Sequence, residues 1–432
     1  MVPPSERLFN RNFTVMIGGQ CVALLGSALY SVVLVLYLKQ LTGSATVLGI
    51  VELLAFLPWV VMGPLAGTFV DRANRKSVIL WSYLVRSALM LVLFLVSFNG
   101  AAALRAAGPF PLIVYVIFFV TACMGIIDSV FSAALNSVIP VVLPKDKLQK
   151  GNSLFQGVGG VLAMAGNALG GIFFTVLGGA LAFLVNGASY LCSALWTGFM
   201  SLRDTRPIRK SSFSCADFAS ETKEGFRFIW RNKGLRDQTM VYTLSNLFFP
   251  MVMLALPFLV EDVMKLKGSY YGYLMSVLTL SSIVAYFVFG SLRTSNRQNY
   301  AVICVLFFIE AAVFLFISFA RNTVIVFALF SVLSGCMAIS RLINTSLKQK
   351  VIPDKLRGRV FGTLDSINGA LAPLSFAVGG VVIDLLNKNL FILFFAIFTA
   401  YTVLAVVFVL SGSIRHFYLS SDTRSITEII DS

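Results

Sequence analysis

Charged side chains are scarce in this chain. Asp, Glu, Lys and Arg together make up 12% of its 432 residues, whereas 58% of the residues are apolar. Soluble globular domains carry charge on roughly a quarter of their residues. A soluble protein of this length could not hide so much apolar surface, so most of that surface must face lipid or other helices within lipid. The composition therefore predicts an integral membrane protein.

Histidine and paired cysteines are also lacking. The chain has one His and six cysteines, and no two cysteines form a CxxC pair. These absences argue against a zinc site or a disulfide framework, and we expect no metal and no cofactor. There is no GK[ST] phosphate-binding motif and no catalytic constellation, so we expect a protein that is not an enzyme.

Long apolar runs occupy most of the chain. They are continuous rather than alternating, which favours membrane-spanning helices over a β-barrel. Each run is near or above the length of about 18 residues that spans a hydrocarbon core. We predict twelve spans in an all-α protein, at 13–38, 45–70, 77–98, 110–140, 152–178, 180–201, 239–260, 269–291, 299–320, 322–347, 359–384 and 388–412.

The distribution of lysine and arginine predicts the orientation. If the N-terminus is cytoplasmic, 26 of the 34 basic residues lie in cytoplasmic segments and six in outer loops. Basic residues favour cytoplasmic loops. We therefore predict a multi-pass protein of the cytoplasmic (inner) membrane with both termini inside the cell. This bias also explains the net charge of +15 without a nucleic-acid partner.

Two similar halves flank a basic linker. The segment LPKDKLQKGN (143–152) in the first half matches VIPDKLRGRV (351–360) in the second. Two six-helix repeats are typical of a duplicated transporter. In the linker, Phe218, Phe226, Ile229 and Trp230 predict an amphipathic helix at the inner membrane surface, with a solvated tether as the alternative for its Ser-rich first half. We predict a six-helix bundle at 1–202, the linker at 203–236, a second bundle at 237–413 and a tail at 414–432.

A short charged stretch follows the second predicted span. It resembles motif A of the major facilitator superfamily, whose pattern is G-x-L-A-D-R-x-G-R-K/R. The matching residues are Gly67, Asp71, Arg72, Arg75 and Lys76. Asn74 stands where the pattern has its second Gly. Asn tolerates the left-handed conformation better than most residues, which would preserve the turn of the pattern. The segments 41–49, 139–154 and 356–366 resemble the macrolide-efflux and enterobactin-exporter-like branch of the superfamily.

The resemblance implies a gating role for this motif. It implies that Asp71 contacts the start of the eleventh span, where Arg357 and Arg359 lie near a helix N-terminus that favours an anion. The cations of the motif would face lipid headgroups. The alternative is that all four charges only anchor the loop inside the cell.

Small residues follow one face of the fifth predicted span. Gly159, Ala163, Gly166 and Gly170 are spaced by four, three and four residues, which predicts close approach of another helix. The end of this run, GNALGG, resembles the antiporter motif C with Asn167 in place of its proline. Helix packing is the better interpretation of the run.

Ionisable residues within the membrane are candidates for function, and six such residues of the predicted spans are considered. The resemblance implies that spans one, four, seven and ten line a central cavity, which selects Asp128 and Arg341. Arg86 and Glu310 occupy equivalent places in spans three and nine, and we expect them to form structural pairs within their own halves. The remaining two are Glu52, near an outer gate, and Asp365, near motif A.

A proton-driven exporter needs a buried carboxylate that exchanges protons near neutral pH. The candidates are Asp128, Glu52 and Glu310, and we predict coupling by Asp128 or Glu52. The polar and aromatic candidates that accompany Arg341 in the cavity are Gln20, Tyr30, Asn136, Asn246 and Phe248. With 39 Phe in the chain, plain packing is the alternative for any single aromatic residue.

These features predict a secondary active efflux transporter that works by alternating access. Its cargo would be drugs or amphipathic small molecules, exported in exchange for protons. The alternatives are a dedicated siderophore or metabolite exporter and a lysophospholipid transporter of the same fold. We expect contact with membrane lipids and a monomeric state.

Overall fold

The computed structural model describes residues 8–98, 110–144, 147–201 and 215–420. The described chain is helical almost throughout. It forms two compact units, one of Met1–Ser212 with Lys265–Ser276 and one of Phe213–Met264 with Val277–Ser432. The linker boundaries predicted at 203 and 236 stay a prediction, and part of that linker lies outside the described residues.

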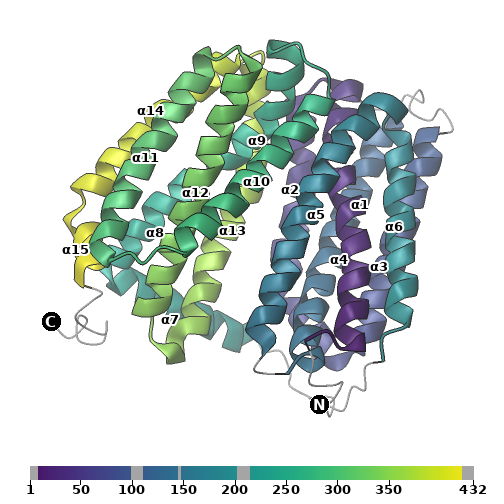
Figure 1. The fold of residues 1–432 in the computed structure, drawn as a ribbon, viewed down its shortest axis with the longest axis horizontal. Helices are drawn as coiled ribbons and strands as arrows, with labels where there is room; N and C mark the ends of the chain where they lie inside the picture. Colours follow the sequence, from purple (N-terminus) through teal and green to yellow (C-terminus); the bar gives the residue numbers. More distant parts are fainter. Residues whose placement is uncertain (1–7, 99–109, 145–146, 202–214, 421–432) are drawn as a thin grey trace. The chain divides into compact units, whose positions relative to one another are not determined.

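The first unit contains six long helices, coloured purple to teal in Figure 1. They are α1 (Arg11–Thr42), α2 (Ala45–Arg72), α3 (Arg75–Phe98), α4 (Leu112–Val142), α5 (Leu148–Leu177) and α6 (Ala180–Gly198).

Local sequence fixes where the first of these helices starts and stops. The side chain of Asn10 accepts a hydrogen bond from the Phe13 amide at 2.9 Å, which caps α1. Gly43 ends α1 in the left-handed region with φ 60°, a conformation that glycine adopts without steric cost. Ser44 then caps α2. Gly43 and Ser44 alone therefore connect α1 to α2.

The turn between α2 and α3 differs from the expectation for Asn74. This residue is not among the described non-glycine residues with positive φ. Its side chain instead accepts a hydrogen bond from the Ser77 amide at 3.2 Å. The prediction of a left-handed turn was therefore wrong, because Asn74 serves as a side-chain cap for α3.

Helices of the first unit pack in pairs, α2 on α4 and α3 on α6, while α1 contacts both α5 and α6. The small residues of α5 make the contact with α1. A Cβ atom added at Gly166 would lie 2.8 Å from the Leu25 carbonyl oxygen, and one at Gly170 would lie 2.7 Å from that of Leu29. The geometry confirms the predicted helix-packing role of this run.

The second unit holds a longer series of helical segments, teal to yellow in Figure 1. They are α7 (Cys215–Arg231), α8 (Lys233–Ser245), α9 (Phe248–Phe258), the π-helical turn η4 (Leu259–Val263), α11 (Asn296–Phe319), α12 (Thr323–Val351), α13 (Asp354–Leu385), α14 (Leu390–Leu410) and α15 (Gly412–Ser420). Helix α10 (Ser269–Gly290) begins in the first unit and continues in the second.

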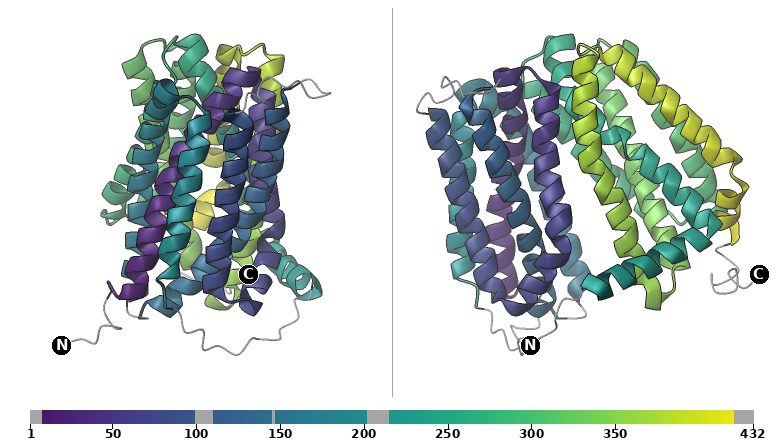
Figure 2. Two further views of the ribbon diagram at one scale, coloured as in Figure 1. Left: turned by 90° about the vertical axis from the view of Figure 1, so that its right-hand side faces the viewer. Right: turned by 180° about the vertical axis from the view of Figure 1, so that it is seen from behind.

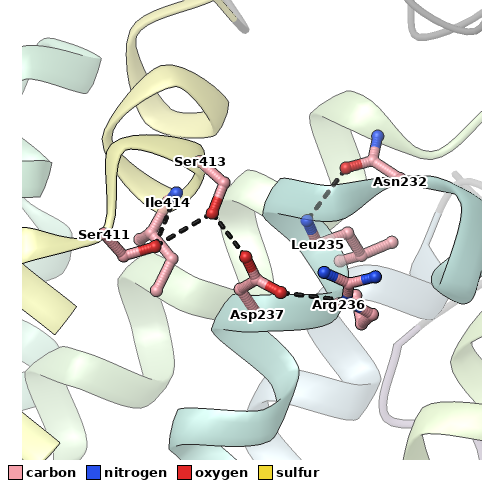
Figure 3. A network of polar contacts seen from close by, with 7 residues as sticks. All are labelled: Asn232, Leu235, Arg236, Asp237, Ser411, Ser413 and Ile414. Carbon is pink, nitrogen blue, oxygen red and sulfur yellow. Dashed lines mark hydrogen bonds and ion pairs between the residues drawn. The ribbon is translucent and has the colours of Figure 1, made fainter. Parts of the chain in front are cut away.

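A polar network ties the ends of α8 and α15 together (Figure 3). Asp237 accepts a hydrogen bond from Arg236 Nε at 2.9 Å and one from Ser413 Oγ at 2.5 Å. Ser411 lies 2.9 Å from Ser413 and also accepts from the Ile414 amide. Asn232 caps α8 through the Leu235 amide. Side chains thus satisfy helix-end backbone groups that no helical partner reaches.

Helix α7 lies across the end of the second unit at which α13 begins (Figure 2). A Cβ atom at Gly225 would lie 2.6 Å from the Arg359 carbonyl oxygen, so only glycine permits this approach. Phe228 and Ile229 are buried. Phe226 and Trp230 stack with their ring centroids 5.2 Å apart and are exposed. The segment predicted as amphipathic is a helix with one packed face and one exposed aromatic face.

Within the described residues, eleven segments are long and apolar enough to cross a membrane. One of them combines α8, α9 and η4 as Lys233–Val263. In α13 the apolar part is shorter, at Leu371–Leu385. Large apolar side chains such as Phe287 and Phe119 are exposed, as expected for contact with lipid. The protein is an all-helical, multi-pass membrane protein, as predicted.

Candidate functional site

The first unit encloses a cavity of about 500 Å³ among α1, α2, α3, α4 and α6. Its charged lining residues are Glu52, Arg86 and Asp128. Its walls are otherwise aromatic, apolar or hydroxyl-bearing, and they include Trp59, Phe131, Tyr30, Tyr190, Met124, Gln20 and Ser27. The cavity therefore offers ionic groups in a mostly apolar enclosure, as small-molecule sites commonly do.

A close helix crossing sets the position of the two acids. A Cβ atom at Gly125 of α4 would lie 2.5 Å from the carbonyl oxygen of Ala55 in α2. Glu52 lies about one turn before Ala55, and Asp128 lies about one turn after Gly125. The absence of a side chain at Gly125 thus allows α2 and α4 to bring both carboxylates to one cavity.

Arg86 occupies a cage in this cavity. Its guanidinium forms an ion pair with Asp128. The same group lies 4.3 Å from the centre of the Phe131 ring and 5.6 Å from that of Tyr190. The Arg86 side chain is 7% exposed and the Asp128 side chain is 50% exposed. A buried cation is therefore held by one carboxylate and two aromatic faces.

Hydrogen bonds fix the polar side chains around this cage. Tyr83 donates to Gln20 Oε1 at 2.7 Å, and the hydroxyls of Ser27 and Tyr190 lie 2.9 Å apart. Tyr190 also packs near Tyr83, with ring centroids 6.3 Å apart. The rings that contact Arg86 are thus held in place by neighbours on α1 and α3.

The ionic groups of this cavity do not balance. Asp128 is compensated by Arg86, whereas no ion pair among the described residues involves Glu52. Glu52 is half-buried and lines the same cavity. With both acids ionised the lining carries one excess negative charge, which costs free energy in a partly desolvated site. A proton or one bound monocation removes that excess.

A second cavity, of about 360 Å³, lies within the second unit. Helices α8, α11, α12, α13 and α14 contribute to its wall. Its charged residues are Glu310, Arg341 and Lys348, and its other polar residues are Tyr242, Ser245, Asn246, Ser340, Asn344, Thr345 and Tyr401. Glu310 is 4% exposed, and its Oε1 atom has no hydrogen-bond partner.

Most of the predicted intramembrane residues line one of the two cavities. Gln20, Tyr30, Glu52 and Asp128 line the first. Asn246, Glu310 and Arg341 line the second.

Two predicted cavity residues line neither of these two cavities, and their place in a central cavity stays a prediction. Asn136 is exposed and is not part of the lining of either cavity. Phe248 packs on Tyr401 with ring centroids 5.7 Å apart, outside the lining of the second cavity. Arg86 does pair within its own half, but it does so as part of the cavity wall. The expectation that span three is peripheral did not indicate that Arg86 lines a cavity.

The motif A residues are only partly described. The side chains of Asp71 and Arg357 lie outside the described ones, and their contact stays a prediction. Arg75 is buried rather than facing outward. Lys76 Nζ donates to the Gly198 carbonyl oxygen at the end of α6 at 2.7 Å, where the helix dipole favours a cation. Arg359 forms an ion pair with Glu224 of α7 at 2.5 Å.

Metal ligands are not grouped in the part of the chain that the structure describes. No three His, Cys, Asp or Glu side chains there are arranged to hold a metal ion. The chemistry of both cavities therefore rests on side-chain charges, amides, hydroxyls and aromatic rings.

Two relatives of similar sequence are efflux proteins by name. The chain is 26% identical over 387 residues to macrolide efflux protein A of Streptococcus pyogenes, which covers 87% of this chain and 90% of the relative. It is 24% identical over 390 residues to the multidrug efflux pump Tap of Mycolicibacterium fortuitum, covering 88% of this chain and 91% of that protein.

Solved structures agree on the fold. A bacterial homologue of the iron transporter ferroportin in an inward-facing state superposes with a TM-score of 0.66 and 16% identity, over 93% of this chain and 100% of the other. The nucleoside transporter NupG superposes with a TM-score of 0.68 and 12% identity, over 92% and 98% of the two chains. At these identities the likeness concerns the fold alone.

The family description "Major Facilitator Superfamily" matches residues 16–375, which is most of the chain. The motif A residues 67–76 lie inside the matched segment. The chain is thus a transporter and not an enzyme, and it belongs to the Major Facilitator Superfamily.

Proposed function

We propose that this chain is a secondary active exporter of lipophilic, cationic small molecules, which it exchanges for protons by alternating access. The observation that carries the proposal is the first-unit cavity, where two carboxylates and one guanidinium lie among aromatic and apolar walls. A cavity of about 500 Å³ is within the size range of small-molecule sites.

The charge imbalance explains both the cargo and the exchange. One excess carboxylate accepts either a proton or a cationic group. Either one neutralises the site, so binding of one disfavours binding of the other. Aromatic walls favour a cation that also carries apolar surface. Competition between proton and cargo for one charge gives antiport, because the empty, ionised site is the costly state.

Glu52 is the proton-exchanging residue in this proposal, with Asp128 in a supporting role. Asp128 already has a cationic partner in Arg86, which stabilises its ionised form. Glu52 lines the same cavity on the neighbouring wall. Of the two carboxylates that the sequence favoured for coupling, Glu52 is therefore the one left to exchange a proton with the cargo.

The names of several relatives support export as the direction of transport. Macrolide efflux protein A and Tap are both efflux proteins by name, and two further relatives are putative bacilysin exporters. We propose a monomer in the cytoplasmic membrane with both termini inside the cell. Asp71 of motif A serves as a gating residue opposite Arg357 and Arg359.

Two other cargoes remain alternatives. A catecholate siderophore carries several negative charges, and the first cavity has one cation, which is already paired. A lysophospholipid would need an opening toward lipid. The cationic amphiphile is favoured over both because its charge is opposite in sign to the uncompensated carboxylate.

The test uses purified protein in liposomes with an imposed pH gradient. Labelled macrolide, catecholate siderophore and lysophospholipid are offered in parallel. We expect gradient-dependent transport of the macrolide alone, abolished by a protonophore. Transport of the siderophore or the lysolipid alone would replace the proposal by the corresponding alternative.

A further inference from the structure

The second-unit cavity has an acidic wall with an unused hydrogen-bond acceptor. Glu310 of α11 is 4% exposed, and its Oε1 atom has no hydrogen-bond partner. The Oδ1 atom of Asn344, on the same cavity, also lacks a partner. Buried acceptors without donors are costly, so a ligand that brings a donor to these atoms would be stabilised here.

The opposite charge lies on α12. Arg341, Asn344, Thr345 and Lys348 are spaced by three, one and three residues, which places them on one face of the helix. All four line the cavity. Arg341 is exposed to it, whereas Lys348 is buried and makes a further interaction within the protein. Arg341 is thus the cation on α12 that is available to a ligand.

The acid and the base face one cavity without joining. Among the ion pairs of the described residues, none connects Glu310 to Arg341. A ligand that carried only an anion would leave Glu310 buried and unpaired, and one that carried only a cation would leave Arg341 unmatched. A ligand with both charges, separated along its length, satisfies both walls.

Aromatic side chains complete the enclosure. Tyr242, Phe307, Phe361 and Tyr401 line the same space, which gives an apolar surface between the charged walls. Tyr242 packs against Phe307 with ring centroids 5.7 Å apart, and Tyr401 donates to the Ser245 carbonyl oxygen at 3.3 Å. A volume of about 360 Å³ is at the low end for ligand sites, which favours a small ligand.

We propose that the second-unit cavity binds a small zwitterion, an amino acid or a short peptide. Glu310 and Asn344 receive the ligand's ammonium group, Arg341 binds its carboxylate, and the aromatic wall accepts an apolar side chain. This site goes beyond the proposed drug export, which rests on the first-unit cavity.

The test is a binding measurement on the purified full-length protein, with no ion gradient. The probes are L-alanyl-L-phenylalanine, its N-acetyl form and its C-terminal amide. Each block removes one charge and leaves the other end intact. We expect the free dipeptide to bind about tenfold or more tightly than either blocked form, since each loses one charge-assisted contact. Equal binding of the free form and either blocked form would overturn the proposal, and this comparison needs no variant.

Two variants then assign the walls. In Glu310→Gln the N-acetyl block should no longer weaken binding, while the amide block still does. In Arg341→Gln the pattern should reverse. Lys350→Gln, on the same helix but outside the cavity lining, should keep both effects. If both variants keep both effects, the dipeptide binds elsewhere and the site is refuted. Because no transport is measured, failure here leaves the proposed export untouched, and failure of export leaves this site untouched.

Discussion

Arg86 of α3 and Asp128 of α4 form an ion pair on the wall of the first-unit cavity, with the Arg86 guanidinium between the rings of Phe131 and Tyr190. The pair removes Asp128 from the set of free carboxylates and gives Glu52 the unbalanced charge. The proposed exchange of one proton for one cationic cargo rests on that imbalance.

Removing one partner of the pair should destabilise the protein more than removing both partners. Asp128→Asn leaves the buried guanidinium of Arg86 without a counter-ion, at a cost of about 2 kcal/mol in the free energy of unfolding. This figure is below that of a fully buried pair, because the Asp128 side chain is 50% exposed to the cavity. Thermal unfolding of the purified variant in detergent measures the loss.

The double variant Arg86→Met/Asp128→Asn provides the control. It removes the buried charge together with its partner, so its unfolding midpoint should lie above that of Asp128→Asn alone. If the double variant is less stable than Asp128→Asn alone, the two residues do not act as a pair.

The sequence predicted the helices and the acids of this site, but not its key cation. Long apolar runs and basic loops suffice to predict spans, because the bilayer imposes length and composition on every crossing helix. Which face of a helix meets which neighbour depends on packing. Arg86 was expected in a structural pair away from the cavity, since span three is peripheral by resemblance. Arg86 and Glu310, which occupy equivalent places in the two halves, instead each line the cavity of their own unit.

The crossing of α2 and α4 should be intolerant of a side chain at Gly125. Gly125→Ala places a Cβ atom 2.5 Å from the Ala55 carbonyl oxygen, so the helices must separate. We expect a loss of about 1–3 kcal/mol in stability and weaker cargo binding, as Glu52 and Asp128 move apart. Thermal unfolding and equilibrium binding of labelled macrolide check both effects.

Gly63→Ala is the matched control on α2. No heavy atom lies within 4 Å of a Cβ atom at Gly63. This variant should be neutral or gain up to about 1 kcal/mol, because alanine favours the helix. Equal behaviour of the two variants would show that the crossing at Gly125 does not position the acids.

Docking of α7 on α13 should depend on shape more than on charge. Gly225→Val forces a side chain against the Arg359 backbone and should detach α7, exposing it to protease. Glu224→Gln removes an ion pair whose side chains are 47% and 41% exposed, so it should cost at most about 1 kcal/mol and leave cleavage unchanged. Limited proteolysis at the α7 segment separates these outcomes. Greater cleavage in Glu224→Gln than in Gly225→Val would contradict this order.

The linker helix also shows the limit of reading one helix at a time. Its hydrophobic residues predicted an amphipathic helix, and α7 is one. The sequence did not indicate that its apolar residues divide between two faces, with Ile229 buried and Trp230 exposed. That division depends on Gly225, whose missing side chain matters only once α13 lies against it. Likewise, the sequence alone did not decide whether Asn74 would form a left-handed turn or cap a helix.

The central claim is that Glu52 exchanges protons for cargo, and Glu52→Gln tests it most directly. Glutamine keeps the size of the side chain and removes its charge. In liposomes, we predict that the variant loses transport driven by a pH gradient but keeps a measurable exchange of labelled for unlabelled cargo at equal pH on both sides, with weakened affinity because the charge that binds the cationic cargo is gone. Wild-type protein should perform both reactions. Gradient-driven accumulation of cargo by Glu52→Gln at the wild-type rate would contradict the account.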